Sequence, residues 1–211
     1  MIVRLILARH GNTFDPQDQP VWVGARSDLP LVEKGLTQAQ ALANALKQAD
    51  IIPAPLIAGP LQRTQQTARI VAETLNLSPA SIHIDPRLTE IDYGAWEGKS
   101  TEEIEALGGG EELAAWNKSS TFPTSPHWQP SEAQIIANTT ALLAEATNGT
   151  SLIVTSNGIL RFFARAALNA QDFPDRKVAT GRICVMEREE AGSWHIKHWN
   201  QPPEILALKA R

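Results

Sequence analysis

An arginine and a histidine end the first apolar segment of the chain. Residues 2–8 are nearly all aliphatic, and the sequence Arg-His-Gly-Asn-Thr follows at positions 9–13. A short aliphatic segment closed by glycine is typical of a strand buried on both faces of a parallel sheet, and ligands bind at the carboxyl ends of such strands. Arg9 offers a planar set of donors that suits a phosphate, His10 offers a nitrogen nucleophile, and Gly11 lets a backbone approach the ligand closely. The pattern indicates phosphate chemistry at the end of this strand.

The same residues also fit a purely structural role. A core strand can end in a polar pair whose histidine is only hydrogen-bonded to its surroundings, and an isolated Arg9-His10 pair favours that interpretation. The choice between the two interpretations depends on what the rest of the chain brings to the same place.

A second strand end has the same character. Residues 151–155 are β-branched and aliphatic, and the chain continues through Asn157 and Gly158 into a helix predicted over 159–168. Small polar residues between a strand and the N-terminus of a helix are typical of an anion site, because the first N–H groups of a helix have no partner within it.

Arg63 is a third candidate. It occupies the first turn of a helix predicted over 61–76, where a cation opposes the helix dipole. That placement is more favourable if a bound anion lies beside the side chain, so we treat Arg63 as a candidate anion ligand.

Four stretches of the chain together resemble the histidine phosphatase superfamily in its phosphoglycerate-mutase-like branch. Positions 9–13 match the Arg-His-Gly-x-Thr/Ser signature of that family. Positions 24–39 are similar to its G-x-x-D-x-P-L loop and the G and Q-A that follow, positions 61–68 to its L-x-R-x-x-x-T-A segment, and positions 88–98 to its L-x-E-x-x-x-G-x-W-E-G segment. The stretches keep the family's order, so the joint match is more specific than Arg-His-Gly alone.

The resemblance implies a catalytic role for four residues. His10 attacks phosphorus and is transiently phosphorylated, Arg9 and Arg63 bind the phosphoryl oxygens, and Glu90 protonates the leaving oxygen. Arginine forks can neutralise a phosphoryl group without a metal ion or other cofactor, and a carboxylic acid supplies the proton that an alkoxide needs in order to leave. Outside the family context, Glu90 would instead be expected as a surface acid paired with Arg87.

Two positions depart from the family pattern. Asn157 stands where family members carry a second histidine. Asparagine can donate a hydrogen bond but cannot carry a positive charge, so we expect the barrier to rise by about 1–2 kcal/mol. Pro16 stands where the family often has an asparagine that reaches the phosphate. The residues expected to bind the phosphate are therefore Arg9, Thr13, Arg63, Asn157 and Gly158.

Three functions follow from this set. The favoured one is a phosphoric monoester hydrolase that forms a phosphohistidine on a small phosphorylated substrate. The alternative is a catalytically weak protein of the same fold that binds a phosphorylated ligand or regulates a partner. A phosphoglycerate mutase is less favoured, because residues 100–130 contain no arginine cluster for a doubly charged acid. His127 is a further candidate, since it could supply the missing imidazole.

The order of the predicted elements indicates the fold class. We expect an α/β protein with a three-layer α/β/α arrangement, in which helices cover both faces of a mostly parallel central sheet. The 211 residues fit a single phosphoglycerate-mutase-like domain over 1–211, and the resemblance implies that residues 2–8 and 151–155 are neighbouring strands. A helix is predicted over 35–48 with Thr37 as its N-cap, and residues 182–188 and 193–199 are predicted as a hairpin with its turn at 190–193.

The segment at about 97–131 is expected to form a lid-like insertion, and a plain surface excursion fits the sequence equally well. It is predicted as two short helices separated by glycines and followed by a segment rich in serine, threonine and proline. Four tryptophans in or near this segment are expected near the mouth of the site, where they could contact an apolar or ring-bearing portion of the substrate or could equally serve packing: Trp22, Trp96, Trp116 and Trp128.

Composition restricts the partners. The net charge of −4, with both signs scattered, argues against general binding to nucleic acid or to anionic membranes, and the expected partner is a small phosphorylated substrate. Cys184 lies in an apolar stretch and is expected in the core, and no histidine or cysteine spacing predicts a metal site. We expect a cytoplasmic monomer or homodimer.

Overall fold

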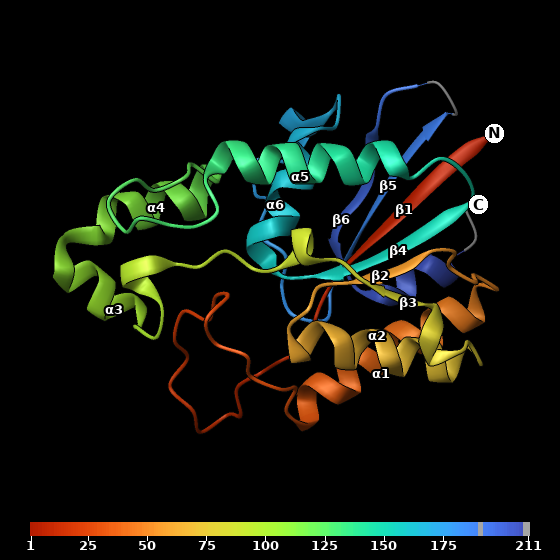
Figure 1. Cartoon of the computed structure of the whole chain (residues 1–211), viewed down its shortest axis with the longest axis horizontal. Coiled ribbons are helices and arrows are strands. Elements are labelled where there is room, and N and C mark those ends of the chain that lie inside the picture. Colours follow the sequence, from red (N-terminus) through yellow and green to blue (C-terminus); the bar gives the residue numbers. More distant parts are fainter. Residues whose placement is uncertain (190–191, 209–211) are drawn as a thin grey trace.

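A six-stranded mixed sheet forms the centre of the molecule in the computed structural model, which describes residues 1–189 and 192–208 (Figure 1). The strands lie in the order β3-β2-β4-β1-β5-β6. Neighbours from β3 to β1 are parallel, whereas β5 and β6 are antiparallel to their neighbours. The strands are β1 (Ile2–Arg9), β2 (Leu56–Ala58), β3 (Ile82–Ile84), β4 (Thr150–Thr155), β5 (Ile183–Glu189) and β6 (His195–Gln201). The predicted α/β class and the predicted hairpin strands are confirmed, while residues 190 and 191 of the predicted turn lie outside the described residues.

Strand β1 lies inside the sheet, and its alternating side chains pack on both faces. Leu5 and Leu7 belong to the hydrophobic cluster on one side, and Ile6 and Ala8 to the cluster on the other. β1 pairs with β4 in parallel register, and Arg9 lies opposite Thr155 at the end of the ladder. The predicted neighbourhood of these two strands is therefore confirmed, and both strands end at the same edge of the sheet.

Helices cover the two faces of the sheet in separate layers (Figure 1). Helices α1 (Glu33–Gln48) and α2 (Gln62–Thr74) cover one face, and α5 (Glu132–Glu145) and α6 (Asn157–Arg165) cover the other. Among residues 1–189 and 192–208, no helix is both long enough and apolar enough to span a membrane. The remaining short helical turns are Pro79–Ser81, Pro86–Leu88, Gly94–Trp96, Ala170–Asp172 and Pro203–Ala207.

Helix α1 begins earlier than the sequence predicts. Val32 takes the N-cap position without a side-chain hydrogen bond, and Glu33 starts the helix. The Thr37 hydroxyl donates to the carbonyl oxygen of Glu33 one turn back. The prediction of Thr37 as the N-cap is therefore wrong, because this hydroxyl bonds within a helix that has already begun.

Residues 101–119 project beyond the strand ends (Figure 1). They form α3 (Thr101–Ile104), a π-helical turn (Glu105–Gly109) and α4 (Gly110–Ser119). Edge-to-face contacts between aromatic rings anchor this segment to the rest of the molecule, with the rings of Trp116 and Trp96 lying 4.9 and 5.3 Å from that of Trp128. These three tryptophans are buried, so they pack the base of the segment and do not surround a mouth. That the segment acts as a lid stays a prediction.

Candidate active site

A pocket of about 400 Å³ lies where β1 and β4 end. It brings together residues that are far apart in the sequence, because the parallel strands and the first turns of α2 and α6 meet at this edge of the sheet. The predicted site residues that line it are Arg9, His10, Thr13, Arg63, Glu90 and Asn157.

His10 is held in one orientation. Its Nδ1 lies 2.7 Å from the carbonyl oxygen of Gly11, and a carbonyl can only accept, so Nδ1 carries the proton and the neutral ring keeps its lone pair on Nε2. Burial lowers the pKa of His10 well below its usual value, and the positive charges of Arg9 and Arg63 lower it further. The imidazole is therefore neutral at neutral pH, with Nε2 available as a nucleophile.

Arg9 and Arg63 place two guanidinium groups in the same pocket. Arg9 Nη1 donates to the carbonyl oxygen of Val178 at 2.7 Å, and Arg63 donates to the carbonyl oxygens of Ser27 and Gly24 at 2.7 and 3.1 Å. Burial lowers the pKa of both groups, which Glu90 counteracts. Within the described part of the chain, neither arginine has a carboxylate oxygen within 4.0 Å. Both arginines thus line the pocket without a carboxylate of the described residues within 4.0 Å.

Glu90 is buried in the pocket. Its two carboxylate oxygens accept from the backbone N–H groups of Ile91 and Gly158, at 2.9 and 3.1 Å. Burial raises the pKa of Tyr93 well above its usual value, as do the charge of Glu90 and a side-chain hydrogen bond to it. Arg87 instead pairs with Asp85 and Glu145, at 2.6 Å each. The alternative of a surface Glu90 paired with Arg87 is therefore wrong.

Gly158 contacts Glu90 through its backbone and is not among the residues that line the pocket. A Cβ atom at this position would lie 2.3 Å from Oε1 of Glu90, so only glycine leaves room for the carboxylate. Gly158 therefore packs against the acid, and its role in binding phosphate stays a prediction.

The structure explains the glycine at position 11 by backbone packing, which differs from the predicted close approach to a ligand. A Cβ atom there would lie 2.2 Å from the carbonyl oxygen of Gly35. The glycine is needed for close backbone packing between the end of β1 and α1.

Asn157 lines the pocket at the start of α6. Its Oδ1 accepts from the backbone N–H of Val178 at 2.8 Å, which leaves the amide nitrogen as the group that can donate to a ligand. Val178 thus holds two site residues, since its carbonyl accepts from Arg9 and its N–H donates to Asn157.

Comparison with known proteins fits this geometry. The sequence profile of the histidine phosphatase superfamily (branch 1) matches residues 5–202. The chain belongs to the histidine phosphatase superfamily. Among solved structures, a mycobacterial glucosyl-3-phosphoglycerate phosphatase has a TM-score of 0.76 at 25% identity, with 94% of this chain and 99% of that chain covered. The α-ribazole phosphatase of Shigella flexneri has a TM-score of 0.73 at 25% identity, with 99% of each chain covered.

Curated relatives include mutases. A 2,3-bisphosphoglycerate-dependent phosphoglycerate mutase of Bifidobacterium longum is 31% identical over 125 residues, which are 58% of this chain and 49% of the mutase. The match thus spans about half the length of that mutase. A probable phosphoglycerate mutase GpmB of Enterobacter sp. (strain 638) is 26% identical over 202 residues, which are 94% of this chain and 90% of the relative. The named relatives are therefore phosphatases and mutases, two kinds of phosphoryl-transfer enzyme.

Sequence reasoning missed a third arginine in this superfamily site. Arg161 lines the pocket and is 1% exposed. It lies four residues after Asn157 on α6, and residues four apart share one face of a helix. That spacing was the signal available in the sequence. Tyr93 and Lys177 also line the pocket without having been singled out.

Two sequence-based expectations do not hold at this pocket. His127 is exposed and is absent from the pocket lining, so it does not supply the missing imidazole. Of the four tryptophans, Trp22 alone lines the pocket. Its backbone pairs with residues 98 and 99 through two hydrogen bonds, of 2.8 and 2.9 Å. The wall that Trp22 forms is therefore attached to the segment that leads into α3.

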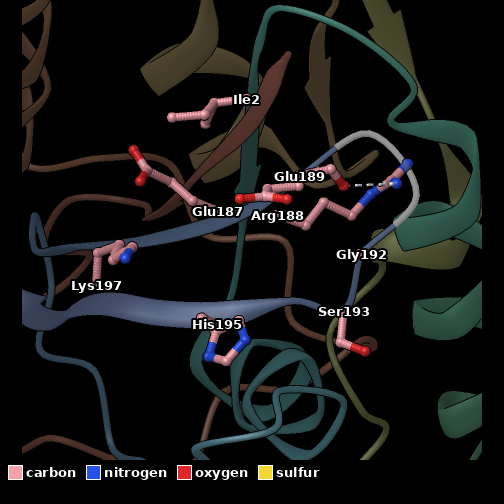
Figure 2. Close-up of a pocket in the computed structure, with 8 residues that line it drawn as sticks. All are labelled: Ile2, Glu187, Arg188, Glu189, Gly192, Ser193, His195 and Lys197. Carbon is pink, nitrogen blue, oxygen red and sulfur yellow. Dashed lines mark hydrogen bonds between the residues drawn. The ribbon is translucent and has the colours of Figure 1, made fainter.

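Another hollow lies at the opposite end of the sheet, between the start of β1 and the hairpin strands (Figure 2). Glu187, which lines it, is paired with Arg4 at 2.7 Å, and Arg188 lies over the ring of Trp194. Within residues 1–189 and 192–208, no three histidine, cysteine, aspartate or glutamate side chains are grouped so that they could hold a metal ion. Among the described residues that line this hollow, none is a buried histidine or a buried carboxylate residue like His10 and Glu90 of the pocket.

Proposed function

We propose that this chain is a phosphoric monoester hydrolase that acts on a small phosphorylated substrate through a phosphohistidine. One observation carries the proposal: His10 presents an unprotonated Nε2 in a pocket that also contains two arginines without a close carboxylate and one buried carboxyl group. A nucleophile, two anion ligands and an acid are the groups that metal-free phosphoryl transfer requires.

In the first step, Nε2 of His10 attacks phosphorus. The N–P bond forms while the bond from phosphorus to the leaving oxygen breaks. Arg9 and Arg63 donate to the phosphoryl oxygens and neutralise the charge that develops there. Glu90, in its protonated form, transfers its proton to the leaving oxygen, so the product departs as an alcohol.

In the second step, water attacks the phosphohistidine. The Glu90 carboxylate left by the first step accepts a proton from the water, the O–P bond forms, and the N–P bond breaks to restore His10. Inorganic phosphate is released, and Glu90 is again protonated for the next turnover. Tyr93 supports both steps because its hydrogen bond helps to hold the carboxyl group.

Asn157 is expected to slow this reaction without preventing it. A neutral hydrogen bond contributes roughly 0.5–1.5 kcal/mol, against roughly 1.5–3 kcal/mol for a charged one. The loss of about 1–2 kcal/mol corresponds to a rate that is lower by about ten- to thirtyfold. We propose a working hydrolase of reduced rate.

The second candidate is a phospho-ligand-binding or regulatory protein with little catalysis. The neutral Asn157 favours it, because binding tolerates a weaker donor better than transition-state stabilisation does. A pure binder has no need of both an available nucleophile and a buried acid, which is why the hydrolase is preferred. Mutase activity ranks third and would be recognised by transfer of the phosphoryl group to a second acceptor.

Hydrolysis of p-nitrophenyl phosphate in the presence of EDTA tests the proposal. We expect turnover by the wild type, none above background by His10→Ala, and wild-type turnover by His195→Ala, which alters the hollow at the other end of the sheet. Activity that survives in His10→Ala, or that disappears with EDTA, would contradict it. An inactive wild type that still binds vanadate or phosphate would favour the binding protein.

A further inference from the structure

The pocket holds more positive charge than a single phosphoryl group uses. Arg9, Arg63 and Arg161 all line it, and Lys177 lies at its exposed rim. Glu90 is the only carboxylate residue that lines the pocket within the described part of the chain, and it must be protonated to act as the acid. A phosphomonoester brings a charge near −2, so two of the four cations are left without a counter-charge.

Arg161 is the cation that the hydrolytic mechanism does not use. It comes from the second turn of α6, and helical side chains tilt toward the N-terminus of their helix, which directs this one back to the pocket. Its Nη1 donates to the carbonyl oxygen of Trp116 at 2.5 Å and to the hydroxyl of Ser120 at 3.1 Å. Those two bonds hold the guanidinium on the side of the pocket that faces α4.

The Arg161 guanidinium keeps one buried donor without a partner among the described residues. Its Nε is buried and has no hydrogen-bond partner, and no carboxylate oxygen of the described residues lies within 4.0 Å of it. One face of the group lies 4.5 Å from the ring of Trp116. A buried cation with unused donors is costly unless a ligand completes it.

Arg165 is a second arginine on the same helix and serves for comparison with Arg161. It lies one turn further along α6, stacks over the ring of Phe162, and donates to Ser120. Unlike Arg161, it pairs with Glu132 at 2.6 Å and does not line the pocket. The contrast between two neighbouring, stacked arginines sets Arg161 apart.

We propose that the substrate carries a second anionic group, a carboxylate or another phosphate, on its leaving portion, and that Arg161 binds this group with Lys177 at the rim. The proposal rests on the hydrolase function proposed above and names its substrate class. The leaving portion then lies between the phosphoryl site and α4, where Thr101 and Asn117 complete the lining. A pocket of about 400 Å³ suits a small metabolite of this kind.

Three probes on one three-carbon frame test the proposal in the wild-type protein. Glycerol 3-phosphate has one anionic group, 3-phosphoglycerate adds a carboxylate, and glycerol 1,3-bisphosphate adds a phosphate. We expect kcat/KM to be at least about tenfold higher for one of the two doubly anionic probes than for glycerol 3-phosphate, as a charged hydrogen bond would give. The better of the two identifies the second group. Equal values for all three probes would overturn the proposal.

Two variants test whether Arg161 is responsible. Arg161→Gln should reduce the preference to about twofold or less, and Lys177→Gln, which alters an exposed side chain, should reduce it partly. Arg165→Gln is the matched control and should keep the full preference. A preference that persists in both Arg161→Gln and Lys177→Gln would overturn the assignment, and the Lys177 and substrate arms remain informative if Arg161→Gln does not fold.

Failure of this proposal is distinguishable from failure of the function. If p-nitrophenyl phosphate is hydrolysed in a His10-dependent way while the three probes are turned over equally, the hydrolase stands and the second anion site falls. If no phosphomonoester is hydrolysed, the function itself fails, and with it the inference.

Discussion

Arginines at the two ends of the central sheet have different partners. Arg4 lies near the start of β1, where its Nε is 2.7 Å from Oε1 of Glu187. Arg9 lies at the end of the same strand, partly buried, with a backbone carbonyl as its partner and a buried Nε that has none. The structure pairs Arg4 with a carboxylate and leaves Arg9 without one within 4.0 Å among the described residues. The comparison shows that the end of β1 combines an arginine without a close carboxylate with a buried histidine and a buried carboxyl group, which is the combination on which the proposed catalysis depends.

The largest expected difference between the two ends is the change in kcat/KM when one arginine at each end is replaced by glutamine. Arg63→Gln should lower kcat/KM for p-nitrophenyl phosphate on the order of 10²–10³-fold, because it removes a donor aimed at the developing charge. Arg4→Gln should change it by no more than about twofold, since a half-exposed ion pair contributes little. Thermal melts of both variants control for folding. Equal losses in the two variants would break the comparison between the ends.

A glycine exchange at each end is expected to have the next largest effect. Gly158→Ala should lower kcat for glycerol 3-phosphate by about ten- to a hundredfold, because the new methyl group displaces the Glu90 carboxyl group that supplies the proton. The loss should be smaller with p-nitrophenyl phosphate, whose leaving group needs no proton. Gly192→Ala, in the opposite hollow, meets only ordinary contacts and should be neutral. An equal loss with both substrates would argue against a role of Gly158 in seating the acid.

Introducing an imidazole at position 157, in the pocket, should raise kcat, whereas the preceding substitutions lower it. Asn157→His should raise kcat by about ten- to thirtyfold, because an imidazolium can donate a charged hydrogen bond where the amide donates a neutral one. The partly exposed Asn138 on α5 does not line the pocket, so Asn138→His serves as the control and should leave kcat unchanged. Loss of activity in Asn157→His alone would mean that the asparagine, through its bond to Val178, has a role of its own.

The smallest effect expected is a shift in titration. Because burial and two arginines lower the pKa of His10 in the folded protein, its ring should stay neutral at pH 6.5, and the NMR titration of its ring signals should have a midpoint below that value. The unfolded chain takes up this proton near pH 6.5, so His10 lowers the free energy of unfolding as the pH falls through 6.5. Arg63→Gln should move the midpoint upward. A midpoint at or above 6.5 in the wild type would contradict the lowered pKa.

Much of the fold could be predicted because its signals are local. The aliphatic run of β1 and the strand at 151–155 are continuous in sequence, and the family resemblance supplied their pairing, which the register from Arg4 to Arg9 confirms. The start of α1 was misplaced because Thr37 has the side chain of a cap but bonds within the helix.

The site could be predicted less completely, because several roles depend on partners that are distant in sequence. The spacing of four residues places Arg161 on the same helix face as Asn157, but its bonds to Trp116 and Ser120, about forty positions earlier, are visible only in the folded chain. Gly158 and Gly11 were expected to face a ligand, but their neighbours are Glu90 and Gly35. The tryptophans were expected at the mouth, but burial of large rings favoured the base of the 101–119 segment for three of them.

The hydrogen bond between Nδ1 of His10 and the carbonyl of Gly11 has a consequence for the phosphohistidine that we propose. Phosphohistidine exists as two regioisomers, one for each ring nitrogen, and they differ in stability and in their reaction with isomer-specific antibodies. Because the backbone occupies one nitrogen, the fold itself selects the isomer. A trapped intermediate should therefore be a single species, substituted on Nε2. Phosphorus NMR of the quenched protein would show which ring nitrogen carries the phosphoryl group.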